Sequence, residues 1–295
     1  HPVLFSPRSA VALEPADTNG KRRQPSLSCT RGHVTSQEPS ERSARNPHQR
    51  SHKSTMSNQT ANETNQVQSN APTPVDAATV VVLREGTAGM EVLMLKKNSK
   101  IYFGGMWVFP GGRVDPQDAH ADDVGTYRRF ERAAVREARE EAAIELTHGT
   151  LKHLSHWLPP AIRPKRFSTH FFVTEAPATL AEVKVDGGEI TEHAWVSPAQ
   201  ALQARHAGKI ELVTPTFVTL DWLRRMRNVA TAMRAIGETP TRYHTHILAT
   251  DDGNIALYDG DVAYESMDPH AAGPRRRANM LNSGWWWEEH DGQGL

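Results

Sequence analysis

The chain has 295 residues, and 34 Lys plus Arg balance 34 Asp plus Glu, so its formal net charge at pH 7 is zero. A balanced charge argues against a protein that coats itself in polyanion, although a local basic patch stays compatible with it. The single cysteine, Cys29, excludes an intramolecular disulfide, and no apolar run approaches the roughly twenty residues that a membrane helix needs. We therefore expect a cytoplasmic protein that does not engage membranes.

The first 74 residues differ in composition from the rest of the chain. Large apolar residues are scarce there, amid Ser, Asn, Gln, Thr, Pro and Arg. Such a tail cannot bury enough surface to offset its chain entropy, so residues 1–74 are predicted to be disordered. Met56 opens a stretch typical of the start of a cytoplasmic protein, and we hypothesise that residues 1–55 are not native.

The folded part begins near residue 75. Two β-rich runs, 78–83 and 91–97, are separated by a glycine-containing turn and predict a hairpin. The run 106–110 predicts a short strand that ends at a proline and a glycine pair. Residues 122–145 are rich in Ala, Arg and Glu and predict a helix over most of their length.

The second half mixes strands and helices without a steady alternation. Strands are expected over 165–176 and 192–196, a helix from 198, and a longer helix over 215–237. A hairpin is expected around 249–253, followed by a final aromatic run. This order favours an α/β fold in which a mixed sheet lies between helices. We divide the chain into the tail 1–74, a main folded domain 75–240, and a helix-plus-strand C-terminal extension, 241–295, packed on that domain.

Two short stretches carry the chemistry: "FPGGRVD" at 109–115 and "REAREEAAIEL" at 136–146. On a helix, Glu137, Glu140 and Glu141 share one face and repel each other unless a cation intervenes, and Mg²⁺ and Mn²⁺ prefer such oxygen ligands. Gly111 and Gly112 let the backbone approach a ligand closely, with a carbonyl turned toward a metal. The alternatives are a solvated helix with salt bridges and an ordinary turn.

The combination resembles the Nudix hydrolase superfamily, whose box reads G-x5-E-x7-R-E-U-x-E-E-x-G-U, with U an aliphatic residue. Gly112 matches the box glycine, the pair Arg136-Glu137 matches R-E, and the pair Glu140-Glu141 matches E-E. The spacing from Gly112 to Arg136 is ten residues longer than the pattern. A widened box occurs in the branch that includes the peroxisomal coenzyme A diphosphatases, and "LKKNSKIYFGGMWVFPGG" is similar to that branch.

Two further departures concern single positions. Counted back from the R-E pair, the early box glutamate falls on Arg128, so it is absent or replaced by Asp115, Asp118 or Glu131. Ala143 stands where the box has its late glycine, a change that costs little if this residue is helical.

The resemblance implies a Nudix-type α/β/α sandwich and a metal-dependent pyrophosphohydrolase. It implies that Glu137, Glu140 and Glu141, helped by the Gly111 carbonyl, bind Mg²⁺ or Mn²⁺, and that Arg136 orients a glutamate. The substrate would be a nucleoside diphosphate linked to another moiety, of the coenzyme A, NADH or ADP-ribose type.

Many family members use a glutamate from outside the box. Glu189 suits that role, Glu192 is the second choice, and the alternative is that Glu189 only occupies an exposed turn. The general base is Glu140 or Glu189. Arg163, Lys165 and Arg166 could meet substrate phosphate, or defend a strand edge by charge. Trp107 and Phe109 could stack on a base, although such residues are more often core.

Three lesser features remain open. His244 and His246 form a potential metal pair on one strand face, without a third ligand. The basic run in 273–280 could grip phosphate or RNA, but such a run is more often a solvated loop. Trp285, Trp286 and Trp287 must include an outward ring if they lie on a strand, which indicates either a homodimer contact or docking of the tail on its own core.

Two other functions stay open as alternatives. One is an RNA 5′-pyrophosphohydrolase that uses the arginine run, although a nucleic-acid partner is not favoured. The other is a non-catalytic Nudix-like regulator that binds a nucleotide.

Overall fold

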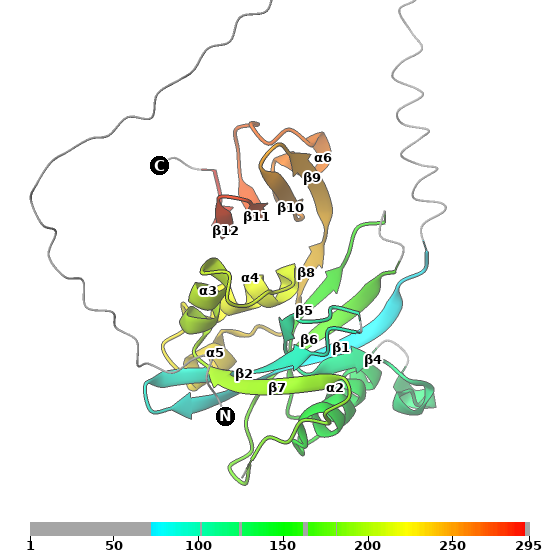
Figure 1. The fold of residues 1–295 in the computed structure, drawn as a ribbon. Helices are drawn as coiled ribbons and strands as arrows, with labels where there is room; N and C mark the ends of the chain where they lie inside the picture. Colours follow the sequence, from blue (N-terminus) through cyan, green and yellow to red (C-terminus); the bar gives the residue numbers. More distant parts are fainter. Residues whose placement is uncertain (1–71, 101, 124–125, 162–164, 181, 293–295) are drawn as a thin grey trace, which may run out of the picture.

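The computed structural model describes residues 72–292, apart from residues 101, 124–125, 162–164 and 181 (Figure 1). The predictions for residues 1–71 lie outside this part of the chain. Eight strands form one mixed sheet, in the order β3-β2-β1-β6-β5-β8, with β4 on β1 and β7 on β2. Its strands are β1 (Val75–Gly86), β2 (Gly89–Lys97), β3 (Trp107–Val108), β4 (Gly111–Arg113), β5 (Lys152–Leu158), β6 (Phe167–Glu175), β7 (Ile190–Val196) and β8 (Thr241–His244).

The large sheet lies between two hydrophobic cores. Strand β1 is β-branched and apolar, and its side chains alternate: Val80 and Val82 pack under α2 (Arg128–Ala142), while Val81 and Leu83 face the other way. The opposite core is covered by α3 (Pro198–His206), α4 (Thr214–Leu223) and α5 (Val229–Ala235), as Figure 1 shows. The predicted α/β/α sandwich with a mixed sheet is confirmed.

A split in the sheet positions the candidate site. Strand β1 pairs with β2 over residues 83–86 and with β4 over residues 77–79, so two different strands follow each other along the same side of β1. The predicted hairpin is the β1–β2 pair. Helix α2 packs across β1 and β4, which brings its glutamate-bearing face to this split.

Two helices differ from expectation. The helix predicted over 122–145 begins at Arg128, preceded by short 3-10 turns η1 (Pro116–Asp118) and η2 (Ala121–Asp123). The Asp123 carboxylate accepts a hydrogen bond from the His120 N–H at 2.7 Å, which closes a turn before the helix. The helix predicted over 215–237 is two helices, because the Asn228 side chain accepts the Thr231 N–H at 2.8 Å and starts α5 anew.

The C-terminal part adds one strand to the large sheet and builds a second one. Strand β8 runs parallel to β5 at the edge of the large sheet. Strands β9 (His246–Thr250), β10 (Gly253–Leu257), β11 (Arg275–Leu281) and β12 (Gly284–His290) form a four-stranded sheet, with α6 (Ala263–Ser266) between β10 and β11. The hairpin expected around 249–253 is the β9–β10 pair. The sequence did not lead us to expect β5 or β11.

The small sheet stacks over α3 and α4, away from α2 (Figure 1). Trp285 packs its ring edge against Phe217 with centroids 5.6 Å apart, while Trp286 is 45% exposed. The predicted alternation of the tryptophans is confirmed, whereas the homodimer and the domain division stay predictions. Within the described ranges, no helix has the length and apolarity needed to cross a bilayer.

Candidate active site

Glu141 lies at the centre of the split between β2 and β4. Its side chain is only 5% exposed, and its two oxygens have different partners. The Gly111 N–H donates to Oε2 at 2.9 Å, and the Lys97 ammonium donates to Oε1 at 2.7 Å. Burial raises the pKa of Glu141, although Lys97 pulls it down. Helix α2 therefore places a nearly buried carboxylate beside the glycine pair at the start of β4.

Glu137 lies one helical turn earlier and packs against Gly112. A Cβ atom at position 112 would stand 2.2 Å from the Glu137 Oε1 atom, so a side chain there would displace the Glu137 carboxylate. Burial, reinforced by the neighbouring Glu141 carboxylate, raises the pKa of Glu137 to about 7. The glycine pair and the glutamates therefore belong to one site.

Gly111 also turns its carbonyl toward this site. Val80 N–H donates to the Pro110 carbonyl, so Gly111 and Thr79 form the next, non-hydrogen-bonded pair of the β1–β4 ladder. Both the amide and the carbonyl of Gly111 consequently point away from β1, on the side where the amide meets Glu141.

The Arg136 guanidinium contacts the carboxylates of both Glu137 and Glu140. Its Nη1 atom lies 3.0 Å from Glu137 Oε1 and 2.9 Å from Glu140 Oε2, and its Nη2 atom donates to the Arg113 carbonyl at 2.8 Å. Burial lowers the pKa of the guanidinium, but the carboxylates of Asp118 and Glu137 outweigh it and raise this pKa above its usual value. Arg136 therefore touches two of the three box glutamates, as an orienting residue would.

Asp118 is the acidic partner of Arg136 and stands at the early box position. It is buried, and its Oδ2 atom lies 3.0 Å from Arg136 Nη2. Counted forward from Gly112, it follows five intervening residues, as in the pattern, so the ten extra residues lie between Asp118 and Arg136. Of the other two substitutes considered, Asp115 is farther from Arg136 at 3.7 Å, and Glu131 accepts the Gly149 N–H instead.

Glu189 reaches the site through Lys97, and Glu192 does not. Lys97 Nζ lies 3.5 Å from Glu189 Oε2, while Glu192 pairs with Lys96 at 2.7 Å. Successive residues of a strand face opposite sides, so Lys96 and Lys97 separate the two glutamates. The backbone N–H of Glu189 is held by Asp186, which fixes the loop that carries it.

Lys97 is a residue of the candidate site that we did not predict from the sequence. A pair of lysines at a strand end was the available signal, since one of them must face the sheet side that carries the helix. The burial of Lys97, whose side chain is 12% exposed, depends on the packing of α2 and could not be predicted from that signal.

The donor set fits a hard divalent cation. Glu141 and Glu137 lie beside Gly111 and Gly112 at the split, and Arg136 links Glu137 to Glu140, so the site is rich in the carboxylate oxygens that Mg²⁺ and Mn²⁺ prefer as ligands. In the part of the chain that the structure describes, no three His, Cys, Asp or Glu side chains are arranged as a metal site. The Arg136 guanidinium contacts the carboxylates of Glu137 and Glu140, and the Lys97 ammonium contacts that of Glu141.

The residues that were predicted to contact the substrate lie in different surroundings. Trp107 and Phe109 are each 2% exposed and belong to the core of the α4 side, so the base-stacking prediction for them is wrong: their rings fill the sandwich. Arg166 donates to the carbonyls of Pro159 and Pro72, and Lys165 lies 5.0 Å over the exposed Tyr102 ring. Arg163 lies outside the described residues.

The basic run at 273–280 is not a solvated loop. It forms β11, and Arg277 Nε lies 2.7 Å from a buried Asp261 oxygen. Arg275 and Arg276 face Glu288 and Glu289 of β12 at 3.9 and 3.5 Å. Because carboxylates neutralise all three guanidinium groups, this strand offers no open basic patch for RNA.

The histidine pair is divided between two strands. His244 ends β8 in the large sheet, where its ring approaches His156, whereas His246 begins β9 and stacks on Tyr264 at 4.0 Å. The two histidines therefore do not share a strand face as the potential metal pair required, since the chain changes sheets between them.

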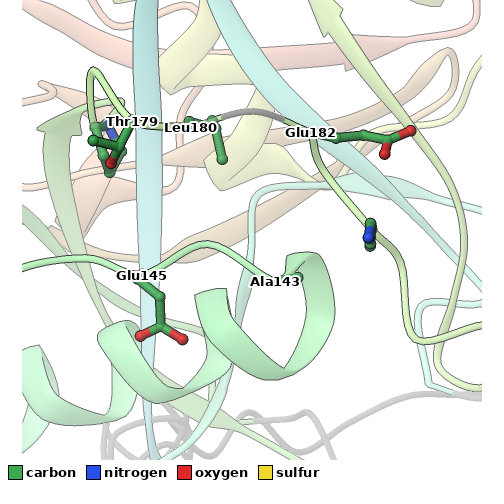
Figure 2. Close-up of a pocket in the computed structure, with 7 residues that line it drawn as sticks. Ala143, Glu145, Thr179, Leu180 and Glu182 are labelled. Carbon is green, nitrogen blue, oxygen red and sulfur yellow. The ribbon is translucent and has the colours of Figure 1, made fainter.

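A separate hollow of about 360 Å³ lies beyond the C-terminal end of α2. Figure 2 shows Ala143 and Glu145 on its helix side and Thr179, Leu180 and Glu182 on the loop across from them. No box glutamate lines it, so we do not include it in the candidate site.

Comparisons with known proteins agree with this geometry. Residues 73–217 match the NUDIX domain family. A Caenorhabditis elegans protein named as nudix hydrolase 7 is 28% identical over 191 residues, which are 52% of this chain and 61% of that protein. Acyl-coenzyme A diphosphatase NUDT19 of Xenopus laevis is 30% identical over 140 residues, 45% of this chain and 36% of that protein. The chain thus spans less than two thirds of either relative.

Among solved structures, the crystal structure of a NUDIX hydrolase from Alicyclobacillus acidocaldarius covers 57% of this chain and 99% of its own, with a TM-score of 0.51 and 23% identity. That likeness supports the fold. The domain match, together with the packing of Glu137 and Glu141 beside the glycine pair, leads to one assignment. The chain carries a NUDIX domain over residues 73–217 and belongs to the Nudix hydrolase superfamily.

Proposed function

We propose that this protein hydrolyses the pyrophosphate linkage of a nucleoside diphosphate joined to another moiety, and that the substrate is of the coenzyme A type. One observation carries the chemistry: Glu141 lies nearly buried between the Gly111 amide and the Lys97 ammonium, with Glu137 packed on Gly112 beside it. The substrate class is supported by the similarity to a protein named acyl-coenzyme A diphosphatase. NADH and ADP-ribose share the same linkage.

In this proposal Glu137, Glu140 and Glu141, with the Gly111 carbonyl, hold Mg²⁺ or Mn²⁺. A bound divalent ion neutralises the phosphoryl oxygens and lowers the pKa of a coordinated water. Arg136 fixes the orientation of Glu137 and Glu140, because Asp118 and the Arg113 carbonyl hold its guanidinium in place.

The proton of the attacking water needs an acceptor. Glu140 and Glu189 are the two candidates, with side chains 49% and 66% exposed. Glu140 already accepts a hydrogen bond from Arg136, while Glu189 has only the longer contact to Lys97. We therefore assign the general base to Glu189 and a ligand role to Glu140.

The test is a substrate panel with product identification. Coenzyme A, an acyl-coenzyme A, NADH, ADP-ribose, a diadenosine polyphosphate and 5′-triphosphate RNA are incubated with the protein and Mg²⁺ or Mn²⁺, and products are separated by mass. The expected products from coenzyme A are adenosine 3′,5′-bisphosphate and phosphopantetheine. No metal-dependent cleavage of any compound would exclude the enzyme in favour of a nucleotide-binding regulator, and preference for RNA would replace the substrate class.

A further inference from the structure

The Lys97 side chain lies where two acidic residues from distant parts of the chain meet. Its ammonium is 2.7 Å from Glu141, on α2, and 3.5 Å from Glu189, in the loop before β7. The Lys97 carbonyl accepts the Gly105 N–H at 2.9 Å, so the backbone at the end of β2 is held, whereas the side chain is a flexible type held through its terminal ammonium. One ammonium thus joins two carboxylates of the candidate site.

The two cations of the site are anchored differently. The Arg136 guanidinium is fixed by Asp118 and by the Arg113 carbonyl as well as by the glutamates it orients. The hydrogen bonds of Lys97 Nζ, by contrast, go to Glu141 and Glu189 alone among the described residues. If a metal cation enters the site, Asp118 and the Arg113 carbonyl still hold Arg136 in place. Lys97 has no such partner outside the glutamates among the described residues.

We propose that Lys97 is an internal counter-ion, which occupies the cation position between Glu141 and Glu189 in the metal-free protein and is displaced when a divalent cation binds. The inference rests on the proposed metal-dependent function of this site and adds a positioning residue to it. Displacement follows from charge, because an ammonium within hydrogen-bond distance of Glu141 repels a dication that shares the same carboxylate. The exposed Glu189 marks the solvent side, toward which the lysine stem can swing.

Mn²⁺ affinity without substrate tests the exchange. Wild type, Lys97→Met and Lys96→Met are titrated with Mn²⁺ alone, by calorimetry or by the loss of the free-ion electron paramagnetic resonance signal. Lys97→Met removes the competitor and leaves Glu141 without a counter-ion, so we expect Mn²⁺ to bind about tenfold more tightly. Lys96 pairs with Glu192 away from the site, so Lys96→Met should bind as wild type does. Equal or weaker binding by Lys97→Met overturns the proposal.

A second measurement uses the wild-type protein and does not depend on how the variant folds. Lysine acylation is followed by mass spectrometry, with and without Mn²⁺. Displacement should make Lys97 react several-fold faster when Mn²⁺ is present, while Lys96 stays unchanged. A Lys97 rate that is constant or falls contradicts displacement.

The two levels of the hypothesis can fail separately. If wild type binds no Mn²⁺, both the proposed function and the counter-ion role fail. If wild type binds Mn²⁺ and Glu141→Gln abolishes that binding, yet neither Lys97 measurement responds, the function stands and only the counter-ion role is lost.

Discussion

The Asp118 carboxylate holds the Arg136 guanidinium from the side opposite the box glutamates, with Oδ2 3.0 Å from Nη2 and both side chains nearly buried. Removing one partner of such a pair leaves a buried charge without compensation. We therefore expect Asp118→Ala to lower the free energy of unfolding by about 3 kcal/mol and to weaken Mn²⁺ binding, because Glu137 and Glu140 lose their orientation. Chemical denaturation and Mn²⁺ titration measure the two effects.

Asp115 supplies the matched control for Asp118. It belongs to the same turn, but its carboxylate is 49% exposed and 3.7 Å from Arg136. Asp115→Ala should change stability by less than about 0.5 kcal/mol, as exposed pairs do. Equal losses of unfolding free energy in the two variants would show that the ion pair of Asp118 with Arg136 stabilises the protein no more than the exposed contact of Asp115 does.

Glutamine substitutions separate the glutamates that the site uses from those it does not. Glu141→Gln keeps the shape but removes the charge, so we expect kcat to fall by at least about 10²-fold with the fold intact. Glu189→Gln should lower kcat by about 10²-fold if it is the general base. Glu192, which pairs with Lys96, is the control, and its glutamine variant should keep wild-type kcat.

Steady-state kinetics on the preferred substrate, with circular dichroism to check folding, measure these effects. A wild-type kcat in Glu189→Gln together with a loss in Glu140→Gln would move the general base to Glu140. Near-wild-type turnover in both Glu140→Gln and Glu141→Gln would end the metal-site assignment.

Ala143 adopts a left-handed conformation at the end of α2, with φ 54° and ψ 36°. The condition under which this change from the box glycine costs little is therefore not met, because a Cβ atom is strained in that region. We expect Ala143→Gly to raise the free energy of unfolding by about 1 kcal/mol. The exposed Ala199 in helix α3 serves as control, since glycine there should cost about 0.5–1 kcal/mol. Urea denaturation measures the free energy of unfolding of both variants. A loss of stability in Ala143→Gly would contradict the claim that Ala143 is strained.

The raised pKa of Glu137 makes the stability of the metal-free protein depend on pH. Burial, with help from Glu141, raises this pKa to about 7 from the ordinary value of 4.5 for a glutamate. A carboxyl that is easier to protonate when folded contributes stability below the unfolded pKa, and that contribution is lost as pH rises through 7. Between pH 5 and pH 8 we expect wild type to lose about 3 kcal/mol that Glu137→Gln does not lose. Denaturation in a metal chelator at both pH values measures the difference, and parallel pH dependences in the two proteins would refute it.

The sequence by itself determined the elements whose signals are local. The glutamates at 137, 140 and 141 share a face because the helix repeats every 3.6 residues, and the alternation of β1 and of Trp285–Trp287 follows from the two-residue repeat of a strand. The family pattern supplied the connection between the glycine pair and the helix. None of these inferences required knowledge of which strand lies beside which.

Only the tertiary structure decided which residues complete the site. Asp118 rather than Asp115 or Glu131 stands against Arg136, and Lys97 joins Glu141, 44 positions away, to Glu189, 92 positions away. The tertiary structure also buries Trp107 and places the arginine run in strand β11, where it pairs with neighbouring strands. Such contacts depend on sheet register, on a bulge in the β2–β7 pair and on how α2 sits over the split. These are long-range choices that no local periodicity encodes, because they are set by the free energy of packing the whole domain.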